Sequence, residues 1–380
     1  MRYEYTHLIP ENVAPKGATG IVIMETETDE DGNKIPVKEA CSIPASRFGD
    51  LTRPAGQPIY SVGWISDGHA HRLDTTFETN RKLANALTFF KEAGCVCVFG
   101  CGDFTETGFY RKNESTSDIT LDDGTVISPQ GIWYDEQQMA RYSGIIGSVS
   151  IPVFEIAGNH ESMYKPITND LTRLKELTGI PATSYTVSSS PDSAESSGTT
   201  VRPNRYAPVG NDLYIMCSQP NWSTPMSSDD FIWLQNTLSA NKGRRCFVAV
   251  HPYMEEDSGD PLDLRENSFF DAWSKTTEYV NLLAQYDNVL TVHGHSHMKF
   301  EHQAVDSRAN YATIKGYRSL HVPSLGKPRN IVGSTTPEDI NSSQCYTMDV
   351  YEDCVVLNGY DLHLNGVPTV EVLGTYKIEV

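Results

Sequence analysis

Three histidines stand at alternate positions near residue 295, where single residues separate His293, His295 and His297. In an extended segment, side chains at positions i, i+2 and i+4 project to the same side. An apolar, β-branched run at residues 290–292 precedes them and predicts a buried strand. Neutral imidazole is the commonest metal ligand in proteins. The stretch therefore predicts a metal-binding turn after a strand. A histidine-rich turn without a ligand is the alternative that the rest of the chain must decide.

Four further stretches place carboxylate, amide or imidazole side chains directly after a predicted strand. They are Asp67 with His69 after residues 59–65, Asp103 after 95–99, Asn159 with His160 after 151–156, and His251 after 246–250. Each cluster alone is a weak signal, because such short patterns are common in ordinary turns. The carboxyl ends of strands in an α/β fold meet at one edge of the sheet. Five clusters in that position therefore favour a shared metal site.

The elements that must position these side chains alternate from about residue 59 onward. Apolar strands are followed by polar loops and then by amphipathic helices, which we predict at residues 74–93, 129–146, 228–240 and 267–286. After the histidine-rich stretch we predict only antiparallel strands, at residues 319–323, 346–351, 354–358 and 369–380. This order predicts an α/β domain that covers residues 58–380.

Residues 1–57 differ from the rest of the chain. Two strand candidates, 20–24 and 34–38, flank an acidic turn that contains Asp31-Gly32, a typical hairpin signal. We therefore predict a small β-rich N-terminal extension as a separate unit.

Composition excludes several functional classes. The net charge of -19 over 380 residues disfavours nucleic acid as a partner, because an acidic surface repels phosphate backbones. We see no apolar run of membrane-spanning length and no secretory signal, and we expect a cytoplasmic protein. The eight cysteines form no C-x-x-C pair and lie mostly in apolar runs, so we expect reduced thiols rather than a disulfide framework.

The ordered set of motifs resembles the calcineurin-like metallophosphoesterase superfamily. The motifs are Asp67-x-His69, Gly102-Asp103-x-x-Glu106, Gly158-Asn-His-Glu161, His251 and Gly294-His-x-His297. The resemblance extends from about residue 59 to residue 325. It implies a two-sheet β-sandwich flanked by helices in four αββα layers. The motif set is specific for the superfamily and poorly specific for the substrate.

The resemblance also implies a dinuclear metal site. One ion would be held by Asp67, His69 and His297. The other ion would be held by Asn159, His251 and His295, and Asp103 would bridge the two. A bridging carboxylate can offer one oxygen to each cation, while imidazole and amide ligands leave the pair strongly Lewis acidic. These ligands are compatible with manganese, iron, zinc, nickel or magnesium. In the superfamily, a hydroxide that bridges the two ions attacks phosphorus in line with the leaving oxygen.

Two further residues match catalytic positions of the superfamily. His160 is implied to face the substrate and to protonate the leaving group. Glu106 matches the position whose carboxylate pairs with that histidine, which would orient the ring and raise its pKa. We expect Glu161 to support the ligands without binding a metal. His293 matches no ligand position, and we expect it to be buried or to support a ligand.

Two differences from known branches of the superfamily narrow the choice of branch for this chain. Thr107 stands where protein serine/threonine phosphatases carry a phosphate-binding arginine. Glu106 stands where purple acid phosphatases carry a tyrosine ligand, and His69 is present where they lack a histidine. The sequence therefore favours metal-dependent hydrolysis of a phosphodiester or a phosphomonoester outside these two branches.

Two alternatives remain open at this point. The fold could serve as a binding or structural module without catalysis, although every ligand position is filled, which favours an enzyme. Residues 1–57 could also attach the chain to a phage or cell-surface assembly, where it would act as a phosphodiesterase on a polymer.

Overall fold

The computed structural model describes most of the predicted catalytic domain and parts of the N-terminal extension. The described residues are 3–4, 20–28, 34–44, 56–71, 78–106, 119–120, 126–127, 134–162, 205–220, 224–253, 274–300, 311–314, 317–330, 337–363 and 369–380. Thr107 and the first parts of the helices predicted from residues 74, 129 and 267 lie outside the described residues.

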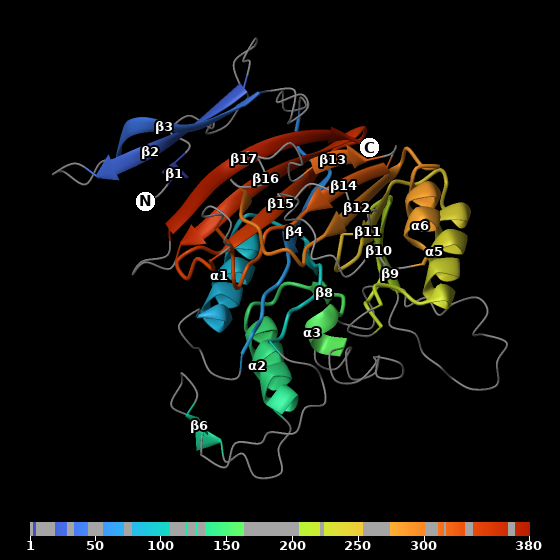
Figure 1. Ribbon diagram of the computed structural model, residues 1–380, viewed down its shortest axis with the longest axis horizontal. Coiled ribbons are helices and arrows are strands. Elements are labelled where there is room, and N and C mark those ends of the chain that lie inside the picture. The colour runs from blue at the N-terminus through green and yellow to red at the C-terminus, as the bar shows by residue number, and fades with distance from the viewer. Residues whose placement is uncertain are drawn as a thin grey trace.

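Two six-stranded sheets form the centre of the molecule (Figure 1). The first contains β4 (Tyr60–Ile65), β5 (Cys97–Gly100), β8 (Val153–Glu155), β15 (Gln344–Val350), β16 (Cys354–His363) and β17 (Thr369–Glu379). The second contains β9 (Arg205–Val209), β10 (Asp212–Met216), β11 (Cys246–Ala249), β12 (Val289–His293), β13 (Tyr311–Ile314) and β14 (Tyr317–His321). Their orders are β17-β16-β15-β4-β5-β8 and β13-β14-β12-β11-β10-β9.

The strands that precede the predicted ligands run parallel within each sheet. In the first sheet β4, β5 and β8 are parallel, and in the second β10, β11, β12 and β14 are parallel. Their carboxyl ends therefore lie at one edge of each sheet. The antiparallel pairing predicted for the last three strands is confirmed in β15, β16 and β17.

The antiparallel pairing predicted for residues 319–323 is right for one neighbour of the strand and wrong for the other. β14 pairs parallel with β12 and antiparallel only with β13. An apolar pattern identifies a strand but does not encode the direction of its neighbour. The edge strands β9 and β13 were not predicted. β9 contains Pro208, which weakens a strand signal and is tolerated at an edge.

An aromatic core lies between the two sheets and holds them face to face. Phe99 of β5 stacks on Tyr214 of β10 with ring centroids 4.1 Å apart and an interplanar angle of 2°. Trp64 of β4 lies 5.3 Å from Phe99 and 6.1 Å from Tyr214. All three side chains are buried, and such pairs add to the free energy gained from the area they bury. The packing brings the ligand-bearing ends of both sheets together.

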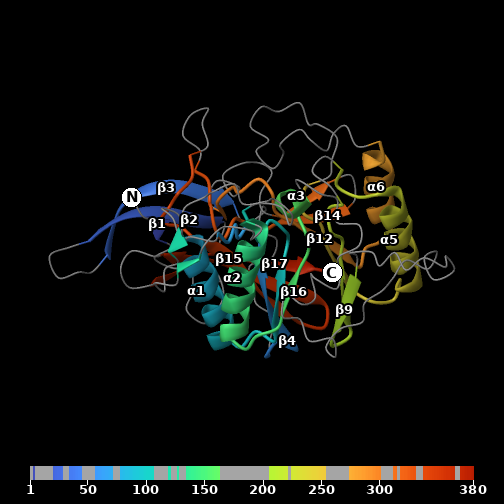
Figure 2. The same ribbon diagram turned by 90° about the horizontal axis from the view of Figure 1, so that it is seen from below.

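Helices cover the outer faces of the sandwich, so the predicted four-layer arrangement is confirmed (Figure 2). α1 (Thr79–Glu92) and α2 (Tyr134–Ser148) pack on the first sheet, and α5 (Ser228–Ala240) and α6 (Thr276–Leu283) pack on the second. The apolar stripe of α1 is buried at Leu83, Leu87 and Phe90. α5 spans the predicted range and is capped by Ser227, whose Oγ accepts a hydrogen bond from Asp230 N at 3.1 Å.

Strands occupy both predicted positions in the N-terminal extension. β2 (Gly20–Thr28) pairs antiparallel with β3 (Lys34–Pro44) and with β1 (Tyr3–Glu4) in a separate three-stranded sheet. The domain boundary at residue 57 stays a prediction. Among the described residues, no helix has the length and apolar character needed to cross a membrane.

A fully buried cation connects α1 to the loop that follows β14. Lys82 is inaccessible to solvent, and its Nζ donates a hydrogen bond to the carbonyl oxygen of Gly326 at 2.7 Å. Burial outweighs the nearby Asp361 carboxylate and lowers the pKa of Lys82 from 10.5 to about 8.

This lowered pKa predicts a change of stability with pH. Between the native pKa near 8 and the unfolded value of 10.5, the unfolded chain binds more protons at Lys82, so the unfolding free energy rises with pH. The measurement is chemical denaturation of the wild type and of Lys82→Met at several pH values. The unfolding free energy of the wild type should rise relative to that of Lys82→Met as the pH increases across this window. A difference that stays constant from neutral to strongly alkaline pH would show that Lys82 titrates normally.

Candidate metal centre

The loops at the carboxyl ends of five strands bring the seven predicted metal ligands together. They are Asp67 and His69 after β4, Asp103 after β5, Asn159 at the start of α3 (Asn159–Ser162) after β8, His251 after β11, and His295 and His297 after β12. Within each sheet, hydrogen bonds join the backbone that follows neighbouring strands, since Gly294 N donates to His251 O at 3.0 Å and Asp67 N donates to Gly102 O at 3.0 Å. The strand ends therefore fix where each side chain starts.

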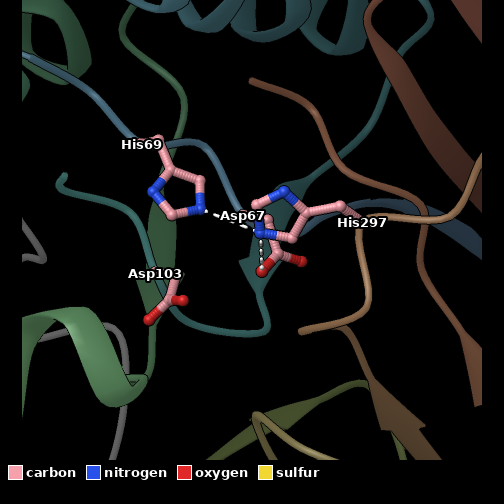
Figure 3. Close-up of side chains that lie close together, drawn as sticks. All are labelled: Asp67, His69, Asp103 and His297. Atoms are coloured by element: carbon pink, nitrogen blue, oxygen red, sulfur yellow. Dashed lines mark hydrogen bonds and ion pairs between the residues drawn. The ribbon is translucent and has the colours of Figure 1, made fainter. Parts of the chain in front are cut away.

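The first group consists of Asp67, His69, Asp103 and His297, which converge on one point (Figure 3). Nε2 of His69 lies 3.0 Å from Nε2 of His297, and Asp67 Oδ1 lies 3.3 Å from the same His297 nitrogen. All four potential ligand atoms lie within 4.8 Å of one another. The group could hold a metal ion.

The second group shares Asp103 with the first and adds His251 and His295. Nε2 of His251 lies 3.1 Å from Asp103 Oδ2 and 3.1 Å from His295 Nδ1. The amide oxygen of Asn159 lies 2.9 Å from the same His251 nitrogen. Because Asp103 belongs to both groups, its carboxylate has the position that a bridging ligand requires.

The tautomers of the histidines show why cations fit here. His69 Nδ1 lies 3.1 Å from the Glu106 carboxylate and His297 Nδ1 lies 3.2 Å from Lys327 O, so each ring carries its hydrogen on Nδ1. The two Nε2 atoms then face each other with lone pairs only, at 3.0 Å. Two nitrogens bound at a right angle to one ion, with bonds of about 2.1 Å, lie about 3 Å apart. A shared cation satisfies this geometry.

His251 repeats the arrangement in the second group. Its Nδ1 donates to Cys101 O at 2.7 Å, which leaves the Nε2 lone pair directed at Asn159, Asp103 and His295. The buried carboxyls add negative charge. Burial alone would raise the pKa of Asp67 and Asp103, but nearby histidines, His297 and His251 first, hold both pKa values below the usual range. These shifts depend on positive charge at the histidines, and a bound cation would supply that charge with the rings neutral.

Backbone conformation distinguishes these residues from the rest of the described chain. Seven non-glycine residues among the described ones have positive φ angles, and five of them are predicted ligands: Asp67 (50°), His69 (47°), Asp103 (52°), His295 (73°) and His297 (63°). Such conformations cost roughly 1 kcal/mol or more per residue and persist only where the surroundings enforce them. Their concentration at one place is the pattern expected of a functional site.

Glu161 supports the ligands from behind, as predicted. Its buried carboxylate accepts hydrogen bonds from the backbone N–H groups of Asp103 (3.0 Å), Thr105 (2.8 Å) and Gly158 (2.8 Å). It therefore ties the loop after β5 to the loop after β8. Burial, and then the neighbouring Asp103 charge, raise the pKa of Glu161 to about 7.

His160 and Glu106 differ from the predicted pair. Nδ1 of His160 donates to the backbone carbonyl oxygen of Glu106 at 2.5 Å, not to its carboxylate. The carboxylate oxygens instead lie 3.1 Å from His69 Nδ1 and 2.7 Å from Lys327 Nζ. The ammonium of Lys327 attracts the carboxylate away from His160, whose ring is already satisfied by the carbonyl. Burial lowers the pKa of His160, but the Asp103 charge outweighs it and raises that pKa.

Lys327 is a site residue that the sequence did not indicate. It lies 221 positions from Glu106 and belongs to no recognisable motif, so no local pattern indicates the pair. His293, which matched no ligand position, is buried, and its ring lies 5.1 Å from that of His321. Ser296 Oγ in turn lies 2.8 Å from His321 Nε2.

Comparisons with known proteins extend these observations. No protein-family model matches the sequence, and no curated protein matches it. A dimetal phosphatase from Danio rerio has a similar structure, with a TM-score of 0.52 and 12% sequence identity over 85% of this chain and 99% of that chain. Vps29 from Chaetomium thermophilum matches with a TM-score of 0.33, 11% identity and coverage of 85% and 99%, which is too low to carry an argument. The chain has the calcineurin-like metallophosphoesterase fold.

The close packing around Asp103 predicts that a methyl group added at Gly158 will reduce metal binding. A Cβ at Gly158 would overlap Asp103 Oδ1, the atom beside both groups. Gly158→Ala should therefore displace Asp103 and lower the number of ions bound per chain, measured by mass spectrometry of metals after dialysis.

Gly144 provides a matched control, because a Cβ there meets nothing within 4 Å and the residue is exposed on α2. Gly144→Ala should keep the wild-type metal content and raise the unfolding free energy by up to about 1 kcal/mol. Unchanged metal content in a folded Gly158→Ala protein would contradict the assignment of Asp103.

Proposed function

We propose that this protein is a phosphoric ester hydrolase that uses two divalent metal ions. The observation that carries the proposal is the pair of ligand groups that share Asp103, in each of which two imidazole nitrogens lie 3.0 or 3.1 Å apart. This is about the separation of two nitrogens bound at a right angle to one ion. The fold, which is that of a dimetal phosphatase, supports the same conclusion.

The metal ligands divide between the two groups. One ion would be held by Asp67, His69 and His297, and the other by Asn159, His251 and His295. Both ions would be bound by Asp103. When bound, the ions would supply Lewis acidity toward the phosphoryl group and make water a stronger nucleophile. Histidine, carboxylate and amide ligands suit manganese, iron, zinc, nickel or magnesium.

His160 has the geometry of a general acid. Its backbone N–H donates to Asp103 Oδ1 at 2.8 Å, and its Nδ1 donates to Glu106 O, which together fix the ring beside the shared carboxylate. Nε2, which lies 4.0 Å from Asp103 Oδ2, is then the nitrogen that can give a proton to a leaving oxygen. The Asp103 charge raises the pKa of His160 above its ordinary value, which favours the protonated ring that a general acid requires.

The acidic chain favours small phosphoesters over nucleic acids as substrates, because the net charge of -19 repels polyanions. Within that class the proposal includes both diesters and monoesters. The seven described cysteines are buried free thiols, which supports a reducing, cytoplasmic location.

The test is hydrolysis of p-nitrophenyl phosphate and bis-p-nitrophenyl phosphate by chelated protein, before and after single additions of Mn²⁺, Zn²⁺, Fe²⁺, Ni²⁺ or Mg²⁺. Metal-restored turnover supports the proposal, and the preferred ester assigns the enzyme as a phosphodiesterase or a phosphatase. A protein that binds two ions and turns over neither ester, nor a panel of natural phosphoesters, would be a binding module.

Removing the shared carboxylate should remove most activity. Asp103→Asn keeps the size of the side chain but cannot hold two cations equally well, so kcat/KM should fall on the order of 10³-fold. Asp353→Asn, an exposed aspartate in the turn between β15 and β16, is the control and should keep full activity. Circular dichroism should show both proteins folded, and a fully active Asp103→Asn protein would refute the site.

Replacing His160 should affect substrates according to their leaving groups. Phenolate is a poorer leaving group than p-nitrophenolate and depends more on protonation, so His160→Gln should slow phenyl phosphate by about 10²-fold or more and p-nitrophenyl phosphate much less. In the wild type, kcat/KM should fall as pH rises through the pKa of His160, above its ordinary value of 6.5, because the acid must be protonated. Equal losses for both esters, with an unchanged pH profile, would remove His160 from this role.

A further inference from the structure

One four-residue segment, Ser324 to Lys327, contacts the predicted ligands of the first metal group. Gly326 N and Ser324 Oγ both donate to the carbonyl oxygen of Asp67 at 3.0 Å. Lys327 O lies 3.2 Å from Nδ1 of His297, at the nitrogen that faces away from the metal position. Besides the shared Asp103, this group has three ligands, and the segment thus holds two of them through its own atoms.

The third ligand is reached through a side chain. Lys327 Nζ lies 2.7 Å from Glu106 Oε1, and Glu106 Oε2 lies 3.1 Å from His69 Nδ1. Lys327 therefore contacts both histidines of this group. Its ammonium orients His69 through the Glu106 carboxylate, and its carbonyl oxygen orients His297. The Nε2 atoms of the two rings lie 3.0 Å apart. The ammonium is the donor that holds the carboxylate against His69.

Hydrogen bonds within the segment and from α1 hold the segment in place. Lys327 N donates to Ser324 Oγ at 2.9 Å, and Lys82 of α1 donates to Gly326 O at 2.7 Å. The second metal group has other supports, since His251 donates to Cys101 O and Asn159 begins the helix that carries Glu161. The two metal positions are therefore braced by different parts of the fold.

We propose that Lys327 is a positioning residue for one metal ion, the one held by Asp67, His69 and His297, and that it controls the occupancy of this position separately from the other. The inference rests on the proposed dinuclear function. Partners of metal-bound histidines typically change metal affinity by about 10- to 100-fold.

Electrostatics and positioning predict opposite effects here, which makes the test decisive. A lysine ammonium repels a divalent cation, so its removal would tighten metal binding if charge alone mattered. If Lys327 acts by holding Glu106 against His69, its removal weakens binding instead. Lys327→Met keeps the backbone carbonyl that contacts His297 and removes only the ammonium.

The experiment is calorimetric titration of metal-free, full-length protein with Mn²⁺. The wild type should bind two ions. Lys327→Met should bind one ion with wild-type affinity and the other about 10- to 100-fold more weakly. Lys327→Arg should recover most of the loss, because a guanidinium also pairs with a carboxylate. Glu106→Gln should reproduce the loss, and the double variant should add little to it.

Two backgrounds identify which ion is affected. In Asn159→Ala, which weakens the second position, Lys327→Met should weaken the remaining ion. In His297→Ala, which weakens the first position, Lys327→Met should leave the remaining ion unchanged. Lys275→Met removes a lysine at the N-terminus of α6 that pairs with Glu278 at 3.2 Å, and it should change neither affinity.

Each outcome bears on one claim. A wild type that binds fewer than two ions contradicts the proposed function itself. A wild type that binds two ions, with a Lys327→Met variant that binds both equally well or more tightly, overturns only the role of Lys327. Equal weakening of both ions in Lys327→Met, without rescue by arginine, would also overturn it.

Discussion

The structure depends on the convergence of two buried carboxylates and four imidazole rings at one place. Burial would raise the pKa values of Asp67 and Asp103, but neighbouring histidines hold them below the usual range, and Nε2 of His69 lies 3.0 Å from Nε2 of His297. Such an arrangement is unfavourable in an isolated chain. It persists because backbone carbonyls and carboxylates hold the outer nitrogens of the rings, and cations complete the inner side.

The arrangement of the two sheets brings these buried ligands together. Parallel strands in both sheets end at the same side, and the stacked Phe99 and Tyr214 rings hold the two sheets together. The loops that follow the strands then adopt left-handed backbone conformations at five of the ligands. Glu161 compensates for part of this strain, because its carboxylate binds three backbone N–H groups of two loops.

The surroundings of the two ligand groups are not equivalent. The first group is supported by the loop after β14 and, through Lys82, by α1, whereas the second is supported by the loop after β5 and by α3. A site built in this way can bind its two ions with different affinities, although the ligand types of the groups are similar. His160 lies beside the shared Asp103, where either ion could influence it.

The sequence by itself determined the residue types and the strand ends. Apolar runs followed by aspartate, asparagine or histidine are local patterns, and they predict an α/β fold with a shared metal site. The resemblance that their order carries added the two-sheet sandwich and the seven ligands. Tertiary structure alone decided the partners of Glu106, the parallel direction of β14 and the place of Lys327. Lys327 and Glu106 are 221 positions apart, and the alternative partner of Glu106, His160, was equally compatible with the pattern. Side-chain pairing between distant loops depends on the packed positions of both, and neither loop encodes that position in its own residues.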